Sequence, residues 1–545
     1  MLLSLPEELQ TLVLEHLALP GCKWSDSDDW PQRDIVPENL ISLSNVCLVS
    51  KSLYRLAWPI LYRAFTNCEP LEGPSSTDRL EPSLFLRTIC LKPEYGLALR
   101  SLSVDLGIPV GAMRASELSE MLQGDATLAA LFQWKVRSFW YGDNDHDEDD
   151  EEDDDSVSMG NNEASAKNDV LTSLLRALNL QLPEAQMAVL LLLCPRLKSL
   201  HIRPGPSRGS SVAAKLLKAI LEAAISEDYQ VADPPQPMYD FEQEESDYIM
   251  AQMFGSPWPE QRMQKLPTLQ HLEQLSLYSS IMPGPGTASF RYLLLALPSL
   301  RTLEVLELAG GVQNPLPDVS LDVRCAQLER LSLIECELDT SDVLEIVKCC
   351  PDLKVLILDW ALGWENPRGL RLGEIVDALA IHTPNLEHMK LSSAQVRGQP
   401  PTARHPYTIG SSLSQLSKLR YLQLDHYAIY GPAGPQDSDS RTPSIQLSEL
   451  LPKNIHFLEI GPNAFTGEPG EECKPVDAWE QWQIDDLNHL LQDESFRRLG
   501  RFQMELNQSS TRRHIHQDTM TRHGWQISED NPENWIFEIE NPRRF

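Results

Sequence analysis

The sequence lacks long apolar runs, closely spaced cysteine pairs and a basic N-terminal start. Its longest apolar runs, such as Ala188–Cys194, are far shorter than the roughly 20 residues that cross a bilayer. The ten cysteines are scattered and include no Cys-x-x-Cys pair, so reduced thiols are expected and not a disulfide framework or a metal site. Met1–Leu19 carries acids without a basic start, so no secretory signal is expected.

Basic residues are few compared with acidic ones. The chain has 46 Lys and Arg against 79 Asp and Glu, a net charge of -33, and eleven of the acids lie between Asp143 and Asp155. Such a surface repels phosphate groups, so nucleic acid is not expected as a partner. Without an apolar span, a membrane is not expected either, and we expect a protein of the cytoplasm, the nucleus or both.

One spacing dominates the sequence: an apolar residue, two variable residues, an apolar residue, one variable residue and a third apolar residue. From the third copy onward, successive copies begin about 25 to 36 residues apart, a period typical of solenoid repeats. The nine copies begin at Leu99, Leu197, Leu272, Leu300, Leu328, Leu353, Leu386, Leu419 and Ile455.

Each copy is predicted to form a short strand, and a helix is predicted between copies. Several copies follow a proline-containing start such as Cys350-Pro351-Asp352-Leu353, where the proline ends the preceding helix and begins the turn into the strand. Apolar residues three or four apart, typical of amphipathic helices, occur at Val343, Leu344, Ile346 and Val347 and again at Ile375, Leu379 and Ile381.

These copies resemble leucine-rich repeats, over about residues 85 to 510. The resemblance implies an α/β fold: an irregular leucine-rich-repeat horseshoe with parallel strands inside and helices outside, in which each repeat packs on its neighbours. Near the C-terminus, apolar residues alternate as in strands that would cover the last repeat; a separate small β-unit is the alternative. These residues are Trp525, Ile527, Trp535, Phe537 and Ile539.

Residues 1–65 follow a different pattern. Leu5-Pro6-Glu7-Glu8 is typical of a helix start, because it places a proline and acids in the first turn. Leu9, Val13 and Leu17 then fall four apart on one helix face. The later motifs of the segment are Leu40–Val49, Ser50–Ala57 and Leu61-Tyr62. Together these motifs resemble an F-box, an all-helical module.

The F-box resemblance implies docking on a Skp-family adaptor, and through it a cullin, by apolar helix faces that enter a groove. Ala18–Glu38 is longer than the usual connection between these helices, so a helical cap of the first repeat is the alternative. Leu17, Leu53 and Leu56 are expected to hold the helices together. The expected adaptor contacts are Leu5, Pro6, Leu9, Val13, Leu43, Val46, Cys47 and Val49.

An F-box joined to leucine-rich repeats implies the substrate-recognition subunit of an SCF-type ubiquitin ligase, which holds an unknown protein substrate. Side chains between the strand leucines point to the concave face, and aromatic and Arg side chains commonly carry binding energy. The candidate substrate contacts are Tyr278, Glu304, Arg330, Ser332, Lys390, Tyr421, Gln423, Phe457 and Glu459.

Two other functions stay open. A leucine-rich-repeat scaffold that binds proteins without a ligase role would have the same fold. A hydrolase would depend on Ser207, within Gly205–Gly209. Pro204 and Pro206 favour an extended loop there, whereas a nucleophile elbow needs a tight turn. We therefore expect no enzyme, no catalytic residues, no cofactor and no bound metal.

The predicted organisation has five parts. They are a helical module at 1–65, a linker and first repeat at 66–141, an acidic insert at 142–168, a repeat array at 169–510 with a loop insert at about 227–264, and a C-terminal cap at 511–545. The acidic insert is expected to be disordered, because like charges at this density oppose collapse.

Overall fold

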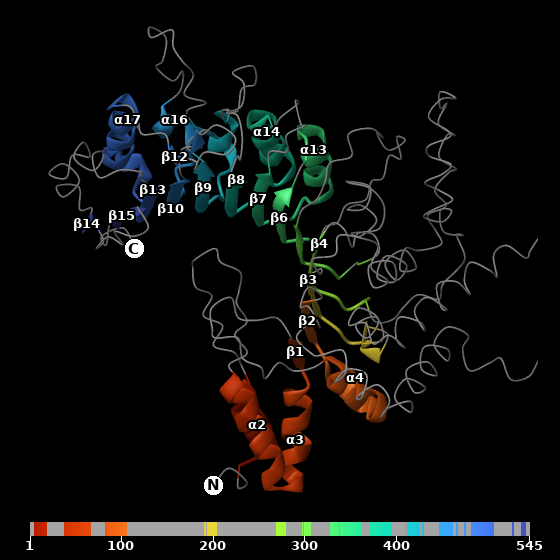
Figure 1. Ribbon diagram of the computed structural model, residues 1–545. Coiled ribbons are helices and arrows are strands. Elements are labelled where there is room, and N and C mark those ends of the chain that lie inside the picture. The colour runs from red at the N-terminus through yellow and green to blue at the C-terminus, as the bar shows by residue number, and fades with distance from the viewer. Residues whose placement is uncertain are drawn as a thin grey trace, which may run out of the picture. The chain divides into compact units, whose positions relative to one another are not determined.

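The computed structural model divides into two compact units (Figure 1). The first unit contains residues 1–275 and 280–283, and the second contains residues 276–279 and 284–545. The described residues are 5–18, 37–66, 82–105, 190–191, 193–203, 269–278, 297, 299–306, 327–336, 338–361, 371–394, 409, 411–425, 428–429, 446–461, 465–466, 474–475, 481–505, 526–527 and 536–540. The acidic insert, the loop insert and Ser207 lie outside them, as does the connection at 19–36.

Three helices open the first unit and form the N-terminal module. They are α1 (Glu7–Ala18), α2 (Pro37–Val49) and α3 (Lys51–Leu61). Glu7 and Glu8 lie in the first turn of α1, where carboxylates favour the positive end of the helix dipole. The Ser50 side chain accepts a hydrogen bond of 3.2 Å from the Leu53 N–H and so caps α3.

A parallel sheet follows the module directly. Its strands here are β1 (Ala64–Thr66), β2 (Ser101–Asp105) and β3 (Ser199–Arg203), and β4 (Gln274–Tyr278) begins in this unit. Two helices, α4 (Pro82–Leu91) and α5 (Pro93–Ala98), lie between β1 and β2 in the chain. β1 pairs in parallel with β2, and β2 with β3. The Gln274 N–H donates to the Lys198 carbonyl at 2.9 Å. The sheet thus begins at Ala64, inside the segment predicted to be helical.

From β5 onward, the described part of the second unit contains seven parallel strands in sequence order. They are β5 (Thr302–Leu306), β6 (Arg330–Cys336), β7 (Val355–Ala361), β8 (His388–Ala394), β9 (Tyr421–Asp425), β10 (Phe457–Gly461) and β13 (Arg501–Glu505). Each pairs in parallel with the next. The predicted α/β class and the predicted strands are therefore confirmed. β13 is a further copy of the motif that the sequence analysis missed, with Phe502 buried at its second apolar position.

Helices lie along one side of these strands (Figure 1). They are α13 (Thr340–Cys349), α14 (Leu372–His382), η4 (Ser411–Gln415), α16 (Leu447–Leu450), α17 (Gln481–Gln492) and η5 (Glu494–Phe496). Val343, Ile346 and Val347 of α13 and Ile375 and Leu379 of α14 are buried, as their spacing predicts. Ile381 is 72% exposed, because it follows buried Leu379 by only two residues and so points to another side of the helix.

The proline-containing starts form turns that are closed by a hydrogen bond. Leu300 donates to the Leu297 carbonyl at 3.0 Å, and Leu386 donates to the Thr383 carbonyl at 3.1 Å. In each turn, proline occupies the second position, which its fixed φ angle favours. Each turn therefore places the strand that follows it in the same register on the preceding strand.

Short strands complete the second unit. β15 (Ile536–Glu540) pairs antiparallel with β13, and β14 (Gln526–Ile527) pairs antiparallel with β15. The C-terminal residues thus extend the sheet beyond its last parallel strand, as the alternating pattern indicates, and do not form a separate β-unit. A two-residue pair, β11 (Phe465–Thr466) and β12 (Lys474–Pro475), lies apart from this sheet.

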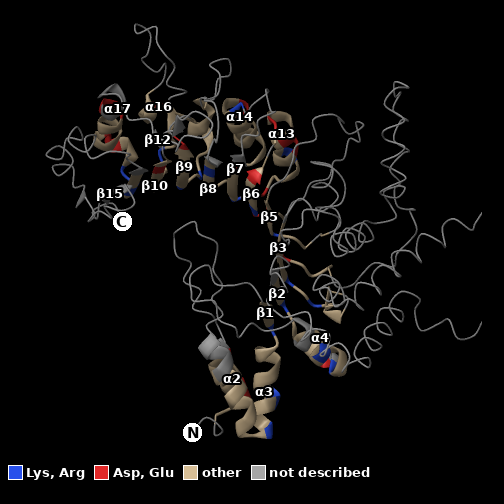
Figure 2. Cartoon of the chain, in the orientation of Figure 1, with Lys and Arg blue, Asp and Glu red and all other residues tan. Residues whose placement is uncertain are grey.

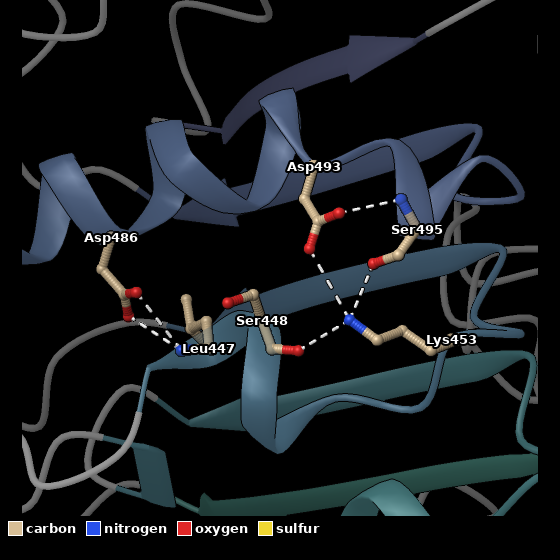
Figure 3. Close-up of polar contacts among 6 residues, drawn as sticks. All are labelled: Leu447, Ser448, Lys453, Asp486, Asp493 and Ser495. Carbon is tan, nitrogen blue, oxygen red and sulfur yellow. Dashed lines mark hydrogen bonds and ion pairs between the residues drawn. The ribbon is translucent and has the colours of Figure 1, made fainter.

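Polar contacts join the helical segments of neighbouring repeats (Figure 3). Both carboxylate oxygens of Asp486 accept from the N–H of Leu447 at 3.2 Å. Lys453 donates to Ser495 Oγ at 2.7 Å and lies 3.6 Å from Asp493 Oδ2. The N–H of Ser495 and the Lys453 ammonium hold the pKa of Asp493 below its usual value. Hydrogen bonds therefore join α16 and the turn that follows it to α17 and η5.

Candidate protein-binding surfaces

The N-terminal module has a small apolar core of its own. Leu14, Leu43, Ala57 and Ile60 are buried in this core, and Val46, Cys47, Leu56 and Leu61 pack partly against it. Leu53 is also buried. Leu53 and Leu56 thus hold the helices together as predicted, whereas the side chain of Leu17 lies outside the described residues.

The burial of Leu43 corrects one predicted adaptor contact. Its side chain has no exposed surface, because it faces α1 and α3 across the module core. It therefore stabilises the module and does not lie on its surface. Val46 and Cys47, two further predicted contacts, are only partly exposed, and burial raises the pKa of the Cys47 thiol.

Other apolar side chains of α1 and α2 remain in solvent. Leu5, Pro6, Leu9 and Val13 are exposed, as expected for contact residues, and Val49 is 69% exposed. Two residues that the sequence analysis did not name are also exposed, Leu12 at 53% and Leu48 at 83%. Leu12 could have been found, because it follows Leu9 by three residues on the same helix face. We call Leu9, Leu12, Val13, Leu48 and Val49 the apolar surface of the module.

Charge is sparse on the part of the module that carries this surface. Ser42–Val49 contains no charged residue (Figure 2). Arg55 of α3 pairs with Glu7 at 2.7 Å, and Arg63, between α3 and β1, pairs with Glu15 at 2.8 Å. These exposed pairs stabilise little, about 0–1 kcal/mol each, but they link α3 to α1. The α2 part of the apolar surface, Leu48 and Val49, therefore has no charged neighbour within Ser42–Val49.

An aromatic cluster connects the module to the first strands. The Tyr95 ring lies 4.6 Å from that of Trp58 and 4.2 Å from that of Tyr62, between centroids. Tyr62 also stacks on Phe85 at 6.0 Å, and the hydroxyls of Tyr54 and Tyr95 share a hydrogen bond. Aromatic pairs of this kind add about 0.5–1.5 kcal/mol each beyond their burial. The cluster holds α3 against α4 and α5 and leaves the apolar surface uncovered by them.

The parallel register places the residues between strand leucines in rows across neighbouring strands. Glu304 lies beside Ser332, and the row continues through Ile357 to Lys390. Gln423 and Glu459 follow on β9 and β10, and Gln423 Nε2 donates to Glu459 Oε1 at 2.9 Å. The predicted alignment of the central column is therefore confirmed from β5 to β10. We call this side of the sheet the strand face.

A second row on the strand face is aromatic. His388, Tyr421 and Phe457 lie on adjacent strands, with ring centroids 5.2 and 5.0 Å apart. The Arg501 guanidinium lies 5.4 Å from the centre of the Phe457 ring, which is within cation–π range. Tyr421 and Phe457 were predicted contacts. Arg501 was missed because β13 was not recognised as a copy of the motif.

The remaining predicted contacts differ in their solvent exposure. Arg330, Lys390 and Glu459 are partly exposed, but Ser332 and Phe457 are buried. Ser332 and Phe457 are thus packed beneath their neighbours on adjacent strands, and a partner could reach little of either side chain. The side chain of Tyr278 lies outside the described residues.

The sequence matches no protein-family model and no curated protein with which it was compared. Each helix in the described ranges is too short or too polar to cross a membrane. In those same ranges, no three His, Cys, Asp or Glu side chains come together as metal ligands. The candidate surfaces therefore have to be interpreted from their own chemistry.

Proposed function

We propose that this chain is the substrate-recognition subunit of an SCF-type ubiquitin ligase. In this proposal the apolar surface of the N-terminal module binds a Skp-family adaptor, and the strand face of a leucine-rich-repeat domain holds a protein substrate. Ubiquitin transfer would then be carried out by other subunits. The chain would act by raising the effective concentration of the substrate near them.

The observation that carries the proposal is the apolar surface itself. Leu48 is 83% exposed and Leu12 is 53% exposed, although burial of a leucine side chain is worth about 1.5–3 kcal/mol. The module core of Leu14, Leu43 and Ile60 is complete without them. Exposed apolar side chains on adjacent helices suit a partner groove, as in helix-in-groove recognition.

The strand face supports the second half of the proposal. It presents His388 and Tyr421, whose row ends on buried Phe457, next to the hydrogen-bonded pair of Gln423 and Glu459. Aromatic side chains surrounded by polar groups are frequent at the centres of protein interfaces. A rigid sheet also holds these groups in place before a partner binds, which lowers the entropic cost of binding.

Binding of the full chain to a purified Skp-family adaptor tests the proposal. We expect Leu48→Asp to weaken this binding at least tenfold, because the new carboxylate would be desolvated in the partner's groove. Ile381→Asp is the matched control, since Ile381 is 72% exposed but lies on α14. It should leave adaptor binding unchanged.

Two results would reject the proposal. One is a failure of the unmodified chain to bind the adaptor. The other is equal binding by the Leu48→Asp and Ile381→Asp variants, which would separate adaptor binding from the apolar surface. Circular dichroism of both variants would show that each retains its helices.

A further inference from the structure

The centre of β5 holds a carboxyl group with an unmet hydrogen-bonding requirement. Glu304 lies between Leu303 and Val305, which are both fully buried. The Oε1 atom of Glu304 is buried and accepts no hydrogen bond from any described residue. A buried acceptor without a donor costs about 1–3 kcal/mol. Such a group calls for a physical explanation, because nearly all buried polar atoms in native proteins are paired.

The surroundings of Glu304 are small or aliphatic. Ser332, its register partner on β6, is small and buried. Two residues further along the same strands, Leu306 lies beside Ile334. Arg330 is the charged neighbour that acts on Glu304, but its guanidinium only partly offsets the effect of burial. The pKa of Glu304 is accordingly raised to about 8.

A second unmet polar group occupies the same motif position in β4. Ser276 is only 9% exposed, and its Oγ has no hydrogen-bond partner among the described residues. Ser276 belongs to the same unit as Glu304, and β4 neighbours β5 in the strand order. Two successive motifs therefore each present an unsatisfied oxygen on the strand face.

We propose that Glu304 and Ser276 form a recognition site for a lysine side chain of the protein that binds the strand face. This inference deepens the proposed function, since it rests on the strand face as a protein-binding surface. It specifies one residue type that the bound protein must carry. The site would select partners by charge and by the reach of a linear side chain.

The chemistry of the site fits an ammonium group better than other ligands. An ammonium has three donors and no acceptor, and Glu304 Oε1 and Ser276 Oγ both lack a donor. The aliphatic stem of a lysine can pack along apolar side chains, which Leu306 and Ile334 provide at partly exposed positions. A carboxylate or phosphate ligand would be repelled by the ionised form of Glu304.

Binding of an ammonium requires the charged form of Glu304. The proton that burial retains on Glu304 would therefore be released when the complex forms. With a pKa of about 8 in the free chain, affinity should rise about 25-fold between pH 6.5 and pH 8.5. The Ser276 hydroxyl does not ionise in this range and so does not produce the same change.

Peptide selection on the immobilised full chain tests the proposal. A displayed library of random peptides serves as the probe, and the peptides selected at pH 8.5 should share a lysine. Replacing that lysine by norleucine should weaken binding at least tenfold on the unmodified chain. The same replacement should change binding less than twofold on Glu304→Gln, which keeps the size of the side chain but cannot ionise. Glu345→Gln, on α13, is the control and should behave like the unmodified chain.

Several outcomes would overturn the lysine site: no selected peptides, selected peptides without a shared lysine, or equal lysine dependence on Glu304→Gln and on the unmodified chain. Failure of this proposal can be distinguished from failure of the proposed function. Adaptor binding by the N-terminal module is measured separately and should be the same for Glu304→Gln as for the unmodified chain. Loss of lysine selection with intact adaptor binding rejects the lysine site alone.

Discussion

Gly96 of α5 lies so close to the Leu193 carbonyl that a Cβ atom at this position would be 2.5 Å from its oxygen. The same Cβ would lie 3.1 Å from Cγ2 of Ile89. Glycine thus permits a close approach between α5 and the backbone that precedes β3. At Gly96, two backbone segments thus approach each other more closely than a residue with a Cβ atom would allow.

Replacing this glycine should destabilise the first unit. Gly96→Ala forces the backbone at Leu193 to move, and overpacking of this kind costs about 1–3 kcal/mol, more than alanine gains by its helix propensity. Chemical denaturation would measure the loss. Leu97→Ala, at an exposed position of the same helix, is the control and should change stability by less than half as much. A gain in stability for Gly96→Ala would contradict the close packing.

Core and surface leucines of the N-terminal module should behave differently. Leu14→Ala removes a fully buried side chain and should lower the free energy of unfolding by about 2–5 kcal/mol. Leu48→Ala removes a side chain that is 83% exposed and should change it by no more than about 0.5 kcal/mol. A large loss for Leu48→Ala in chemical denaturation would show that Leu48 packs within the chain and is not available to a partner.

The raised pKa of Glu304 predicts a pH dependence of stability. Between its ordinary value of 4.5 and its folded value of about 8, the folded chain retains a proton that the unfolded chain releases. Stability is therefore lost as the pH rises through this window. Glu304→Gln cannot ionise, so its stability relative to the unmodified chain should rise by about 3–4 kcal/mol between pH 5 and pH 8. Urea denaturation at both pH values measures this, and an equal stability difference at the two pH values would refute the raised pKa.

Glu335 has a φ angle of 53°, in the left-handed region that non-glycine residues seldom adopt. It lies in β6 where the register with β7 shifts between Leu333 and Cys336. Because its side chain is exposed, Glu335→Gly should relieve the backbone strain and raise the free energy of unfolding by about 1 kcal/mol. Glu335→Ala keeps the strain and should bring no gain. Equal stabilisation by alanine and glycine would show that backbone strain at Glu335 is not the cause.

Asp486 should determine how firmly α16 is held. Asp486→Ala removes the carboxylate that accepts from the Leu447 N–H, and loss of this bond should cost about 1–2 kcal/mol. Amide hydrogen exchange of the peptide that contains Leu447 should then become faster. Asp486→Asn keeps one acceptor and should have a smaller effect. Unchanged exchange in the alanine variant would show that α16 does not depend on this contact.

The strands were predictable because their signal is local and repeated. Two apolar residues separated by one variable residue, as in Leu331 and Leu333, define a strand with one buried side, and both of these residues are fully buried. Repetition then aligns the strands, so the row from Glu304 to Glu459 could be predicted from numbering alone. β13 was missed because an aromatic residue, Phe502, takes the place of an aliphatic one.

The surfaces were only partly predictable from the sequence. Leu43 and Leu48 are both apolar residues of α2, yet one is buried and the other is exposed. Which of the two faces the core depends on where α1 and α3 pack, and no local pattern specifies that. The unpaired oxygen of Glu304 could not be predicted either, because it depends on which side chains of neighbouring strands surround it.

The sequence alone determined that short strands and helices alternate and that the strands share one register, because these follow from the spacing of apolar residues. Tertiary structure alone decided which apolar and charged side chains lack partners. Leu48 lies in solvent and Glu304 holds a buried, unpaired oxygen. Both properties arise from the packing of segments far apart in the chain, and residue spacing carries no information about that packing.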